Sequence, residues 1–278
     1  MSNREQLASV IVLIIPVLFM LVFFAAPLTL FLAEAFQDPA GPWVPFKSLL
    51  GIKVYRQIFT GTLSLALVVT IAAVIISYPI AFVLSRAKGT RFKVILYCVL
   101  FPLWVSVLIR TFSWVLILET NGPINRALVS SGLFDAPVQL LFNDTGVFIG
   151  MIHVLTPYAL LPIYTAMSRV DNHLLLASGG LGASLWSTFL RVYLPLTAPG
   201  IAGGAVFVFL LSLGFFITPA ILGGINAISL SMLIEQFVSE DLDWIRAAAA
   251  SLILFVSVLV ILGLGSRFIR LNQMSTHG

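Results

Sequence analysis

Six long stretches of apolar residues that are almost free of charge constrain this chain more than any short motif does. The stretches cover residues 11–33, 63–85, 94–118, 146–168, 196–222 and 247–266. Each reaches the length of about 20 residues that a helix needs to cross a bilayer core about 30 Å thick. The apolar residues run continuously instead of alternating with polar ones, which indicates helices and excludes a transmembrane β-barrel. We therefore expect an all-α, polytopic membrane protein with six transmembrane helices, in which residues 1–278 form a single membrane domain.

The composition supports this assignment and excludes several other classes of protein. Of the 278 residues, 60% are hydrophobic and 9% are charged, whereas soluble domains carry about 25% charged residues. A soluble enzyme, a disordered chain and a nucleic-acid-binding module are therefore excluded. The net charge of +4 requires no acidic partner, because Lys and Arg are expected beside membrane spans on the cytoplasmic side. The first apolar stretch is longer than the core of a signal peptide, so we expect it to be a retained anchor.

The distribution of charges between the loops predicts the orientation in the membrane. If the N-terminus lies in the cytoplasm, the cytoplasmic segments hold nine Lys and Arg residues and two acidic residues. The outer segments then hold five basic and nine acidic residues. Because basic residues concentrate on the cytoplasmic side of membrane proteins, both termini are predicted to be cytoplasmic. The acidic outer loops would attract a cation, contribute to a docking surface for a partner protein, or simply be solvated.

The sequence lacks the motifs of nucleotide hydrolysis and of common hydrolytic or metal-dependent enzymes. No Gly-Lys dipeptide is present, so a phosphate-binding Walker A loop cannot form, and HExxH, GxSxG and CxxC are also absent. We expect no catalytic residue, no metal site and no cofactor. A membrane enzyme would show paired carboxylates or a histidine cluster at one depth. An ion-driven secondary transporter would need carboxylates near the bilayer midplane, and the six stretches contain none away from their ends.

Two apolar stretches depart from a plain transmembrane helix. Arg110 lies well inside residues 94–118, where an arginine costs about 3 kcal/mol on insertion, so its side chain should face protein, water or a counter-ion. Glu119 is a candidate partner, and alternatively the Arg110 side chain reaches the outer interface. The stretch 196–222 is rich in Gly and Pro, which predicts a kinked or broken helix. His153 has no ionisable partner three or four residues away and is predicted to pack or to line a pore.

The cytoplasmic segment 169–195 is too long for a simple turn and too amphipathic for a linker. Its glycine-rich centre predicts two short helices bent at an elbow, with Ser184 as the N-cap of the second helix. Spacings of three and four place a set of apolar residues on one face of that helix. These residues are Leu185, Trp186, Phe189, Val192 and Tyr193. Such an element either docks into a groove on a soluble partner or lies on the lipid surface.

The same segment resembles the EAA loop of the permeases of binding-protein-dependent ABC importers. The ATPase-coupling residues that the resemblance implies are Asp171, Leu176, Ala177, Ser178, Gly182, Ala183 and Pro195. Leu176 stands where the family carries an acid, and Gly179 and Gly180 stand where charged residues are usual. These departures remove the carboxylate of a coupling salt bridge but leave a helix–Gly–helix docking element, with Gly182 as a residue of close approach.

The likeness covers nearly the whole chain and resembles the spermidine/putrescine permease subgroup in particular. It is carried by IRTFSW at 109–114, NGPIN at 121–125, FITPAILGG at 216–224 and DW at 243–244. Phe215 departs from the pattern, because many relatives carry Asp there. A cation site in this chain cannot depend on that carboxylate.

The resemblance implies a type I ABC importer permease fold in a bacterial inner membrane, with this chain forming half of the translocation pathway. The implied partners are a second permease subunit, two cytosolic ATP-binding subunits that hydrolyse ATP, and an extracytoplasmic substrate-binding protein. A polyamine is the first substrate candidate, and an amino-acid-like compound, an opine or a phosphonate is the alternative. The pathway residues that the resemblance suggests are Arg110, Glu119, Thr218, Pro219 and Asp243.

Overall fold

The structure is a computed structural model that describes residues 14–224 and 227–274. In this part of the chain all regular structure is helical. The chain forms two compact units. Unit 1 contains the described residues up to Gln57 and from Leu233 onward, and unit 2 contains Ile58–Met232. The expected all-α class is therefore confirmed.

Unit 1 combines helices from both ends of the described chain. Its elements are η1 (Leu21–Ala25), α2 (Ala26–Glu34), α3 (Val44–Gly51), most of α13 (Leu230–Ser239) and α14 (Trp244–Met274). The π-helical segment η1 lies within an apolar helix that covers Ile14–Glu34. α14 packs against α2 and α3, and the rings of Phe31 and Trp244 meet edge to face at 6.5 Å between centroids.

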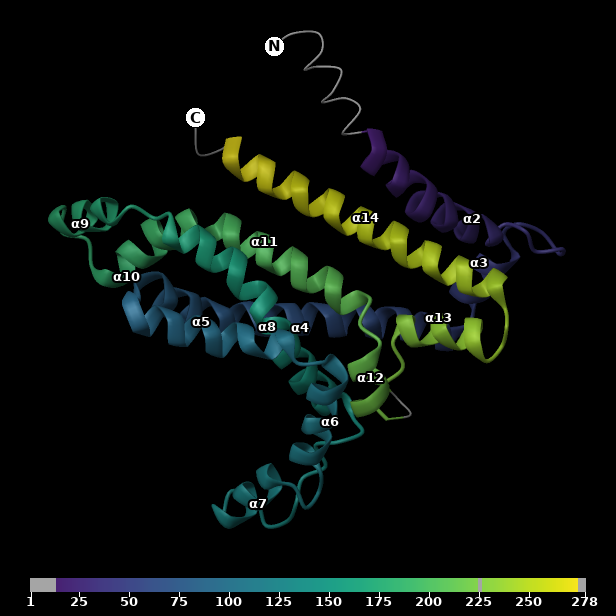
Figure 1. The fold of residues 1–278 in the computed structure, drawn as a ribbon, viewed down its shortest axis with the longest axis horizontal. Coiled ribbons are helices and arrows are strands. Elements are labelled where there is room, and N and C mark those ends of the chain that lie inside the picture. The colour runs from purple at the N-terminus through teal and green to yellow at the C-terminus, as the bar shows by residue number, and fades with distance from the viewer. Residues whose placement is uncertain (1–13, 225–226, 275–278) are drawn as a thin grey trace, which may run out of the picture. The chain divides into compact units, whose positions relative to one another are not determined.

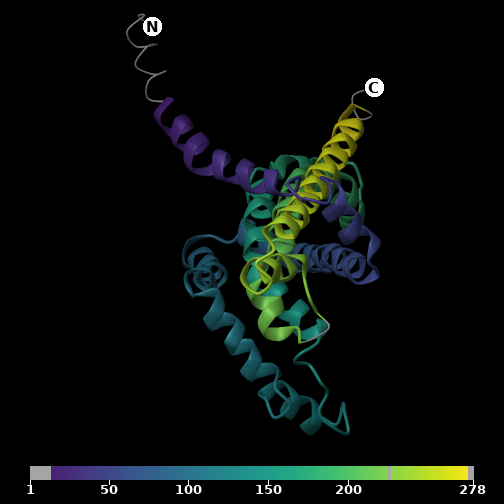
Figure 2. The same ribbon diagram turned by 90° about the vertical axis from the view of Figure 1, so that its right-hand side faces the viewer.

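Unit 2 contains four long helices with shorter helices at both ends. Its elements are α4 (Lys53–Arg86, which begins in unit 1), α5 (Gly89–Trp104), α6 (Val107–Leu118), α7 (Pro123–Ser130), α8 (Asp144–Ser168), α9 (Asn172–Gly180), α10 (Leu185–Thr188), η2 (Phe189–Tyr193), α11 (Leu194–Leu213) and α12 (Ile217–Leu222). Within this unit, α9 and α10 lie at one end of the long helices, and α6, α7 and α12 lie at the other (Figure 1). Figure 2 shows α6 and α7 leaving the long helices as a separate arm.

Small residues allow α8 and α11 to pack closely. A Cβ atom added to Gly200 would lie 2.7 Å from the carbonyl oxygen of Pro162. A Cβ atom added to Gly204 would lie 2.8 Å from the carbonyl oxygen of Ala159. Helices in membranes associate through close packing at such small residues, because the hydrophobic effect does not drive helix association in lipid. These two glycines of the Gly-rich stretch therefore fix the spacing of two long helices.

Hydrogen bonds attach α4 to the same pair of helices. The Ser77 hydroxyl donates to the carbonyl oxygen of Thr156 on α8 at 2.9 Å. The hydroxyls of Tyr78 and Thr197 on α11 share a hydrogen bond of 3.1 Å. α4, α8 and α11 thus form one packed group, with buried Val69, Leu155 and Val208 in its core.

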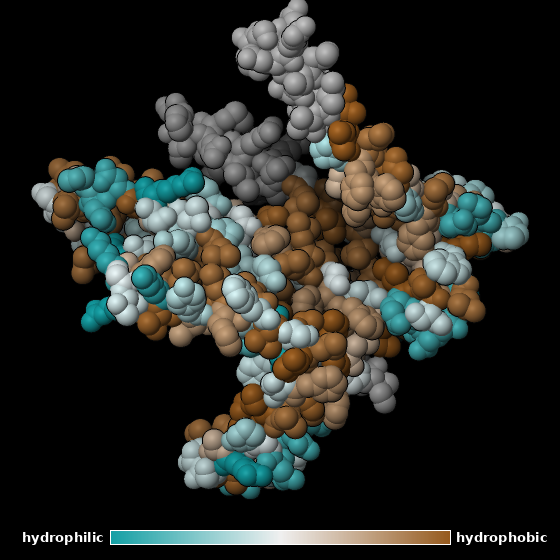
Figure 3. All heavy atoms as spheres, in the orientation of Figure 1, coloured by the Kyte–Doolittle hydropathy of each residue, from teal (hydrophilic) through white to brown (hydrophobic). Residues whose placement is uncertain are grey.

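Five helices of the described chain are long and apolar enough to cross a membrane. There are six such segments if α5 and the bent helical segment that follows it, Val107–Ser130, are counted as one span. The face seen in Figure 3 has apolar residues (brown) over the long helices and hydrophilic residues (teal) at the α9 and α7 ends of unit 2. Many large apolar side chains are exposed, for example Leu30 at 70% and Phe101 at 68%. This surface suits lipid and agrees with the expected six transmembrane segments.

The third predicted segment, 94–118, is not one continuous helix. α5 ends at Trp104, and the chain bends by 100° before α6 begins. Pro102 lies in the last turn of α5, and Val105 and Ser106 adopt extended backbone conformations. A proline removes a helical hydrogen bond and crowds the preceding turn, so the sharp bend follows it. The prediction of one continuous span over 94–118 did not take this proline into account.

The fifth predicted segment, 196–222, is broken as its Gly and Pro residues indicate. α11 ends at Leu213, Gly214 caps it, and α12 begins at Ile217. The freed backbone groups must be satisfied by neighbouring helices, since lipid offers no hydrogen-bond partner. α12 packs on α6 and α8, which supplies that environment.

Candidate functional site

At one end of unit 2, residues 171–193 form the predicted elbow of two short helices. Asp171 is the N-cap of α9, and its Oδ1 accepts a hydrogen bond from the backbone N–H of His173 at 2.9 Å. Ser184 is the N-cap of α10, as predicted, and its hydroxyl accepts from the backbone N–H of Ser187 at 3.2 Å. Both helices of this coupling elbow therefore begin at defined residues.

The turn between the two helices is a Schellman motif centred on Gly182. The N–H of Ala183 donates to the carbonyl oxygen of Ser178 at 3.1 Å, and the N–H of Gly182 donates to that of Gly179 at 2.9 Å. Gly182 has a φ of +83°, which glycine adopts without strain. No atom of the described chain lies within 4 Å of an added Cβ at this position, so the expected role of Gly182 in close approach to a partner stays a prediction. The left-handed backbone alone already favours glycine here.

Side-chain contacts hold the two arms of the elbow together. The hydroxyls of Ser178 on α9 and Thr188 on α10 share a hydrogen bond of 2.8 Å. Ala177 is exposed and Ala183 is half-buried. Pro195 lies in the first turn of α11, directly after the elbow. The elbow is thus a small rigid element rather than a loose loop.

The predicted apolar face of the second helix divides into two parts. Phe189 and Tyr193 turn toward α4, where their rings meet Tyr78 at 6.0 Å and Phe82 at 5.6 Å. Leu185 is 92% exposed and Trp186 is 69% exposed. The rings of Trp186 and Phe189 stack at 5.6 Å between centroids, and those of Phe189 and Tyr193 stack at 6.3 Å. These three side chains therefore lie in one row, as the spacing predicted, although the helix has π geometry over Phe189–Tyr193.

Six large apolar side chains remain exposed on the elbow. They are Leu174, Leu176, Leu181, Leu185, Trp186 and Leu190. Residues 172–188 contain no Asp, Glu, Lys or Arg. Between Asp171 and Arg191 the elbow therefore presents an apolar surface without Asp, Glu, Lys or Arg.

At the opposite end of unit 2, the broken helix α12 is fixed to α6 and α8. Thr111 on α6 and Thr218 on α12 are both buried, and their hydroxyls lie 3.2 Å apart. A Cβ atom added to Gly150 on α8 would lie 2.8 Å from Cγ2 of Thr218. Pro219 is buried as well. Thr218 and Pro219 thus belong to one packed junction.

Arg110 lies one residue before Thr111, and its guanidinium is only partly satisfied. Its Nε and Nη1 atoms are buried without a hydrogen-bond partner among the described residues. The candidate pairing with Glu119 is not formed among the described residues. One turn further along α6, the indole N–H of Trp114 donates to Nδ1 of His153 at 3.1 Å, so His153 has a packing partner.

Glu119 follows the last residue of α6 and lines an open cavity of about 550 Å³. The buried side chain of Asn125 ties two walls of this cavity together. Its Nδ2 donates to the carbonyl oxygens of Glu119 at 3.1 Å and Val138 at 3.0 Å, and its Oδ1 accepts from the N–H of Val138 at 2.8 Å. The sequence contained this residue in the NGPIN motif but gave no sign of its role.

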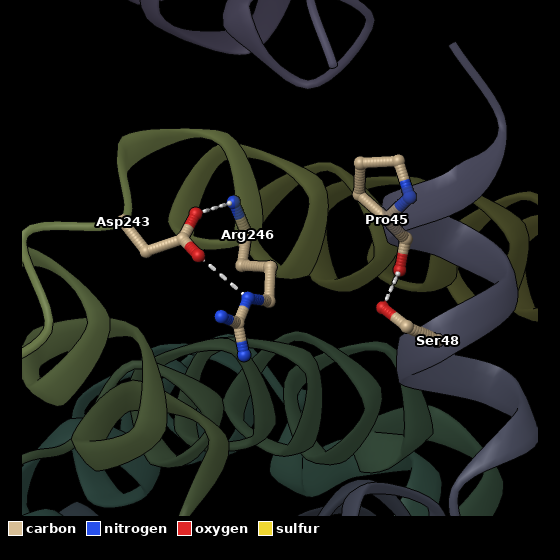
Figure 4. Close-up of polar contacts among 4 residues, drawn as sticks. All are labelled: Pro45, Ser48, Asp243 and Arg246. Atoms are coloured by element: carbon tan, nitrogen blue, oxygen red, sulfur yellow. Dashed lines mark hydrogen bonds and ion pairs between the residues drawn. The ribbon is translucent and has the colours of Figure 1, made fainter. Parts of the chain in front are cut away.

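Asp243 belongs to unit 1, and its carboxylate is used within its own helix. Oδ1 accepts from the backbone N–H of Arg246 at 2.8 Å, and Oδ2 accepts from Nε of Arg246 at 2.6 Å (Figure 4). The same view shows Ser48 donating to the carbonyl oxygen of Pro45 at 2.7 Å in α3. Asp243 thus caps α14, while the other four suggested pathway residues lie in unit 2.

Known proteins resemble this chain both in sequence and in fold. The PotB permease protein of the spermidine/putrescine transport system is 33% identical in Haemophilus influenzae over 199 residues, which are 72% of this chain and 70% of that protein. The Escherichia coli PotB protein is 31% identical over 203 residues, 73% of this chain and 74% of that protein. The molybdenum transport system permease protein ModB of Mycobacterium bovis is 26% identical over 227 residues, 81% of this chain and 84% of that protein.

Solved structures share the fold at lower sequence identity. A bacterial ABC transporter involved in the import of the acidic polysaccharide alginate matches with a TM-score of 0.74 and 20% identity, covering 96% of both chains. The alginate transporter in complex with its alginate-bound periplasmic protein matches with a TM-score of 0.79 and 20% identity, covering 96% of this chain and 95% of that chain. The type I permease fold is thereby confirmed.

The family described as inner membrane components of binding-protein-dependent transport systems matches residues 77–269, which include the coupling elbow and the α12 junction. Such permeases work together with a second permease, ATP-binding subunits and a binding protein. This chain therefore belongs to that family and is a multi-pass inner-membrane permease subunit of a binding-protein-dependent importer.

Proposed function

We propose that this chain forms one half of the translocation pathway of an ATP-driven polyamine importer and performs no catalysis itself. It lacks a phosphate-binding loop, so a separate subunit hydrolyses ATP. Its partners are a second permease subunit, two cytosolic ATP-binding subunits and an extracytoplasmic binding protein. The observation that carries the proposal is the coupling elbow, a rigid element with an exposed apolar surface that has no Asp, Glu, Lys or Arg within residues 172–188.

The coupling elbow docks into an apolar groove of the ATP-binding subunit. Leu181 and Leu185 are 89% and 92% exposed, and Trp186 is 69% exposed. At protein interfaces, a few well-buried residues near the centre supply most of the binding free energy, and aromatic residues are common among them. Leu176 adds to this surface where relatives carry an acid. The contact therefore depends on apolar burial rather than on a salt bridge.

The elbow then transmits movement of the ATP-binding subunit to the long helices. The Schellman turn at Gly182 and the bond between Ser178 and Thr188 keep its two arms together. Phe189 and Tyr193 attach it to α4, and it continues directly into α11. The pathway switches between inward and outward access only if the elbow binds the ATP-bound and ATP-free states of its partner with different free energy.

In the membrane, the elbow end of unit 2 faces the cytoplasm and both chain termini lie on that side. Four basic residues flank the elbow end, as the preference for cytoplasmic Lys and Arg requires. They are Arg86, Lys88, Arg169 and Arg191. The opposite end, with α7 and the cavity beside Glu119, then faces the outside. Residues 1–278 act as a single permease domain in this arrangement.

The pathway runs past the junction of α6, α8 and α12. Arg110, Thr218 and Pro219 lie at or beside this junction, and Glu119 lies at the outer end of α6. Asp243 contributes at the outer mouth, where its pairing with Arg246 fixes the start of α14. A broken helix at such a place offers backbone carbonyl groups to a passing solute.

The substrate class follows from the relatives, since two of them are named for spermidine and putrescine transport. One observation favours a second candidate. The two unpaired guanidinium nitrogens of Arg110 would suit an anionic group, as in an amino-acid-like compound, an opine or a phosphonate.

Uptake by the reconstituted transporter distinguishes these candidates. The experiment measures accumulation of radiolabelled putrescine, spermidine, glutamate and an alkylphosphonate in proteoliposomes that contain the complete transporter. We expect putrescine or spermidine uptake that requires ATP, the ATP-binding subunits and the binding protein. Uptake of the anionic compounds alone would support the second candidate. Uptake by this chain alone, driven by a proton gradient, would show an ion-driven secondary transporter instead.

A further inference from the structure

The cavity at the end of α6 has the size and the mixed lining of a small-molecule site. Its volume of about 550 Å³ lies within the range of about 300–1,000 Å³ that is typical of ligand pockets. One wall comes from the last turn of α6 and the residues after it, and the other comes from the segment that precedes α8. All of its lining residues belong to unit 2.

The chemistry of the lining suits a cation. Glu119 is the single ionisable residue that lines the cavity, and within the described residues its carboxylate has no ion-pair partner. Thr120 and Gln139 add a hydroxyl and an amide, and Phe142 adds an aromatic ring that is 59% exposed. Val115 and Leu116 are among the apolar residues that complete the wall. Any anion would be repelled by Glu119 without a compensating basic group.

Two features hold the walls in place before any ligand arrives. Asn125 is 1% exposed and bridges the backbone at Glu119 to the backbone at Val138. Phe142 has a φ of +60°, a strained conformation for a residue other than glycine. Gly224 packs closely against this residue, since a Cβ atom there would lie 2.6 Å from the carbonyl oxygen of Phe142. Because these walls are already fixed, the entropic cost of ordering them on binding is small.

We propose that this cavity binds a protonated alkylamine, as the first site that the solute occupies on the permease. An ammonium group carries three N–H donors. The Glu119 carboxylate, the Gln139 carbonyl oxygen and the Thr120 hydroxyl can accept hydrogen bonds from them. The face of the Phe142 ring attracts the same charge. The methylene chain lies along Val115 and Leu116. The position of the site at the outer mouth, and thus its place in the transport sequence, depends on the proposed function.

Equilibrium binding to the assembled transporter tests the site. The permease pair with its ATP-binding subunits is placed in lipid nanodiscs without the binding protein, and binding of radiolabelled putrescine is measured by scintillation proximity. We expect saturable binding to the wild type and an approximately tenfold weaker affinity for Glu119→Gln, since a charge-assisted hydrogen bond is lost. Phe142→Leu should weaken affinity about threefold. Asp135→Asn removes an acid near the cavity that does not line it, and should leave binding unchanged.

The outcomes separate this site from the proposed function. If the wild type binds no putrescine, or if Glu119→Gln and Phe142→Leu both bind as the wild type does, the site is wrong. An equal loss of affinity in Asp135→Asn would also overturn it, because a general negative field would then explain binding. Binding that depends on Glu119 without any polyamine uptake would refute the proposed substrate while leaving the site in place. Equal melting temperatures of the variants check that each is folded.

Discussion

The two ends of unit 2 use opposite kinds of surface. The coupling elbow exposes Leu181, Leu185 and Trp186 and has no charged residue within 172–188. The cavity at the other end is organised around a single carboxylate, Glu119, and a buried amide, Asn125. A contact with a protein can use broad apolar burial, whereas recognition of a small solute needs few polar groups in fixed positions. The comparison predicts that variants at one end leave the function of the other end intact.

The largest effect is expected at the turn of the elbow. Gly182→Asp places a side chain where φ is +83°, which costs about 1–2 kcal/mol, and it adds a charge to an apolar docking surface. We expect ATP-driven uptake to fall to background, while membrane insertion and putrescine binding to the cavity persist. Uptake in proteoliposomes and binding in nanodiscs measure the two properties. Gly132→Asp is the matched control and should leave uptake unchanged, because Gly132 also has a positive φ of +72° and no atom near an added Cβ but lies outside the elbow. Normal uptake by Gly182→Asp would refute the elbow as the coupling element.

A smaller effect is expected when the exposed aromatic ring of the elbow is replaced. Trp186→Asp should weaken association with the ATP-binding subunit about 30-fold, which corresponds to about 2 kcal/mol. Association is measured by titrating the detached ATP-binding subunit onto nanodiscs that hold the permease pair. Phe134→Asp makes a similar aromatic-to-acid change in an exposed loop near the other end of unit 2 and should have no effect on association. Unchanged affinity for Trp186→Asp would show that this ring lies on lipid instead.

The smallest effect concerns the walls of the cavity. Asn125→Ala removes three hydrogen bonds and takes these partners from the backbone N–H and carbonyl oxygen of Val138, while the carbonyl oxygen of Glu119 still accepts from the N–H of Gly122. We therefore expect a loss of stability of about 1 kcal/mol. Putrescine affinity should fall with it, while association with the ATP-binding subunit should not change. Thermal unfolding and the two binding assays measure these three quantities. Asn121→Ala, an exposed position just before, is the control. If Asn125→Ala weakened association as strongly as putrescine binding, the separation of the two ends would be incorrect.

Local signals in the sequence predicted the elbow well. Glycines at 179, 180 and 182 indicated the bend, and the hydroxyl of Ser184 was recognised as a cap because capping depends on only a few neighbouring residues. The break in the Gly- and Pro-rich stretch 196–222 was predicted for the same reason. Such features are decided within one or two helical turns, so a single sequence contains them.

Features that depend on distant contacts were not predictable in this way. The π-helical geometry of Phe189–Tyr193 was not predicted, because the spacing argument assumes α-helical geometry. Pro102 was visible, but Pro79 and Pro157 lie inside helices that continue past them, so a proline alone did not indicate the 100° bend after α5. Asn125 acts through Val138, thirteen residues away, and the pairing of Arg110 with Glu119 was a guess from proximity along one helix that the described structure does not contain.

The exposed leucines and tryptophan of the elbow have a consequence for a cell that makes this subunit. Contiguous apolar surface in water promotes aggregation and is recognised by quality-control systems. A copy of the chain that is inserted before its ATP-binding partner arrives holds Leu181, Leu185 and Trp186 in the open. We therefore expect balanced synthesis of the two subunits to matter for this transporter, with surplus permease being the first component to be degraded.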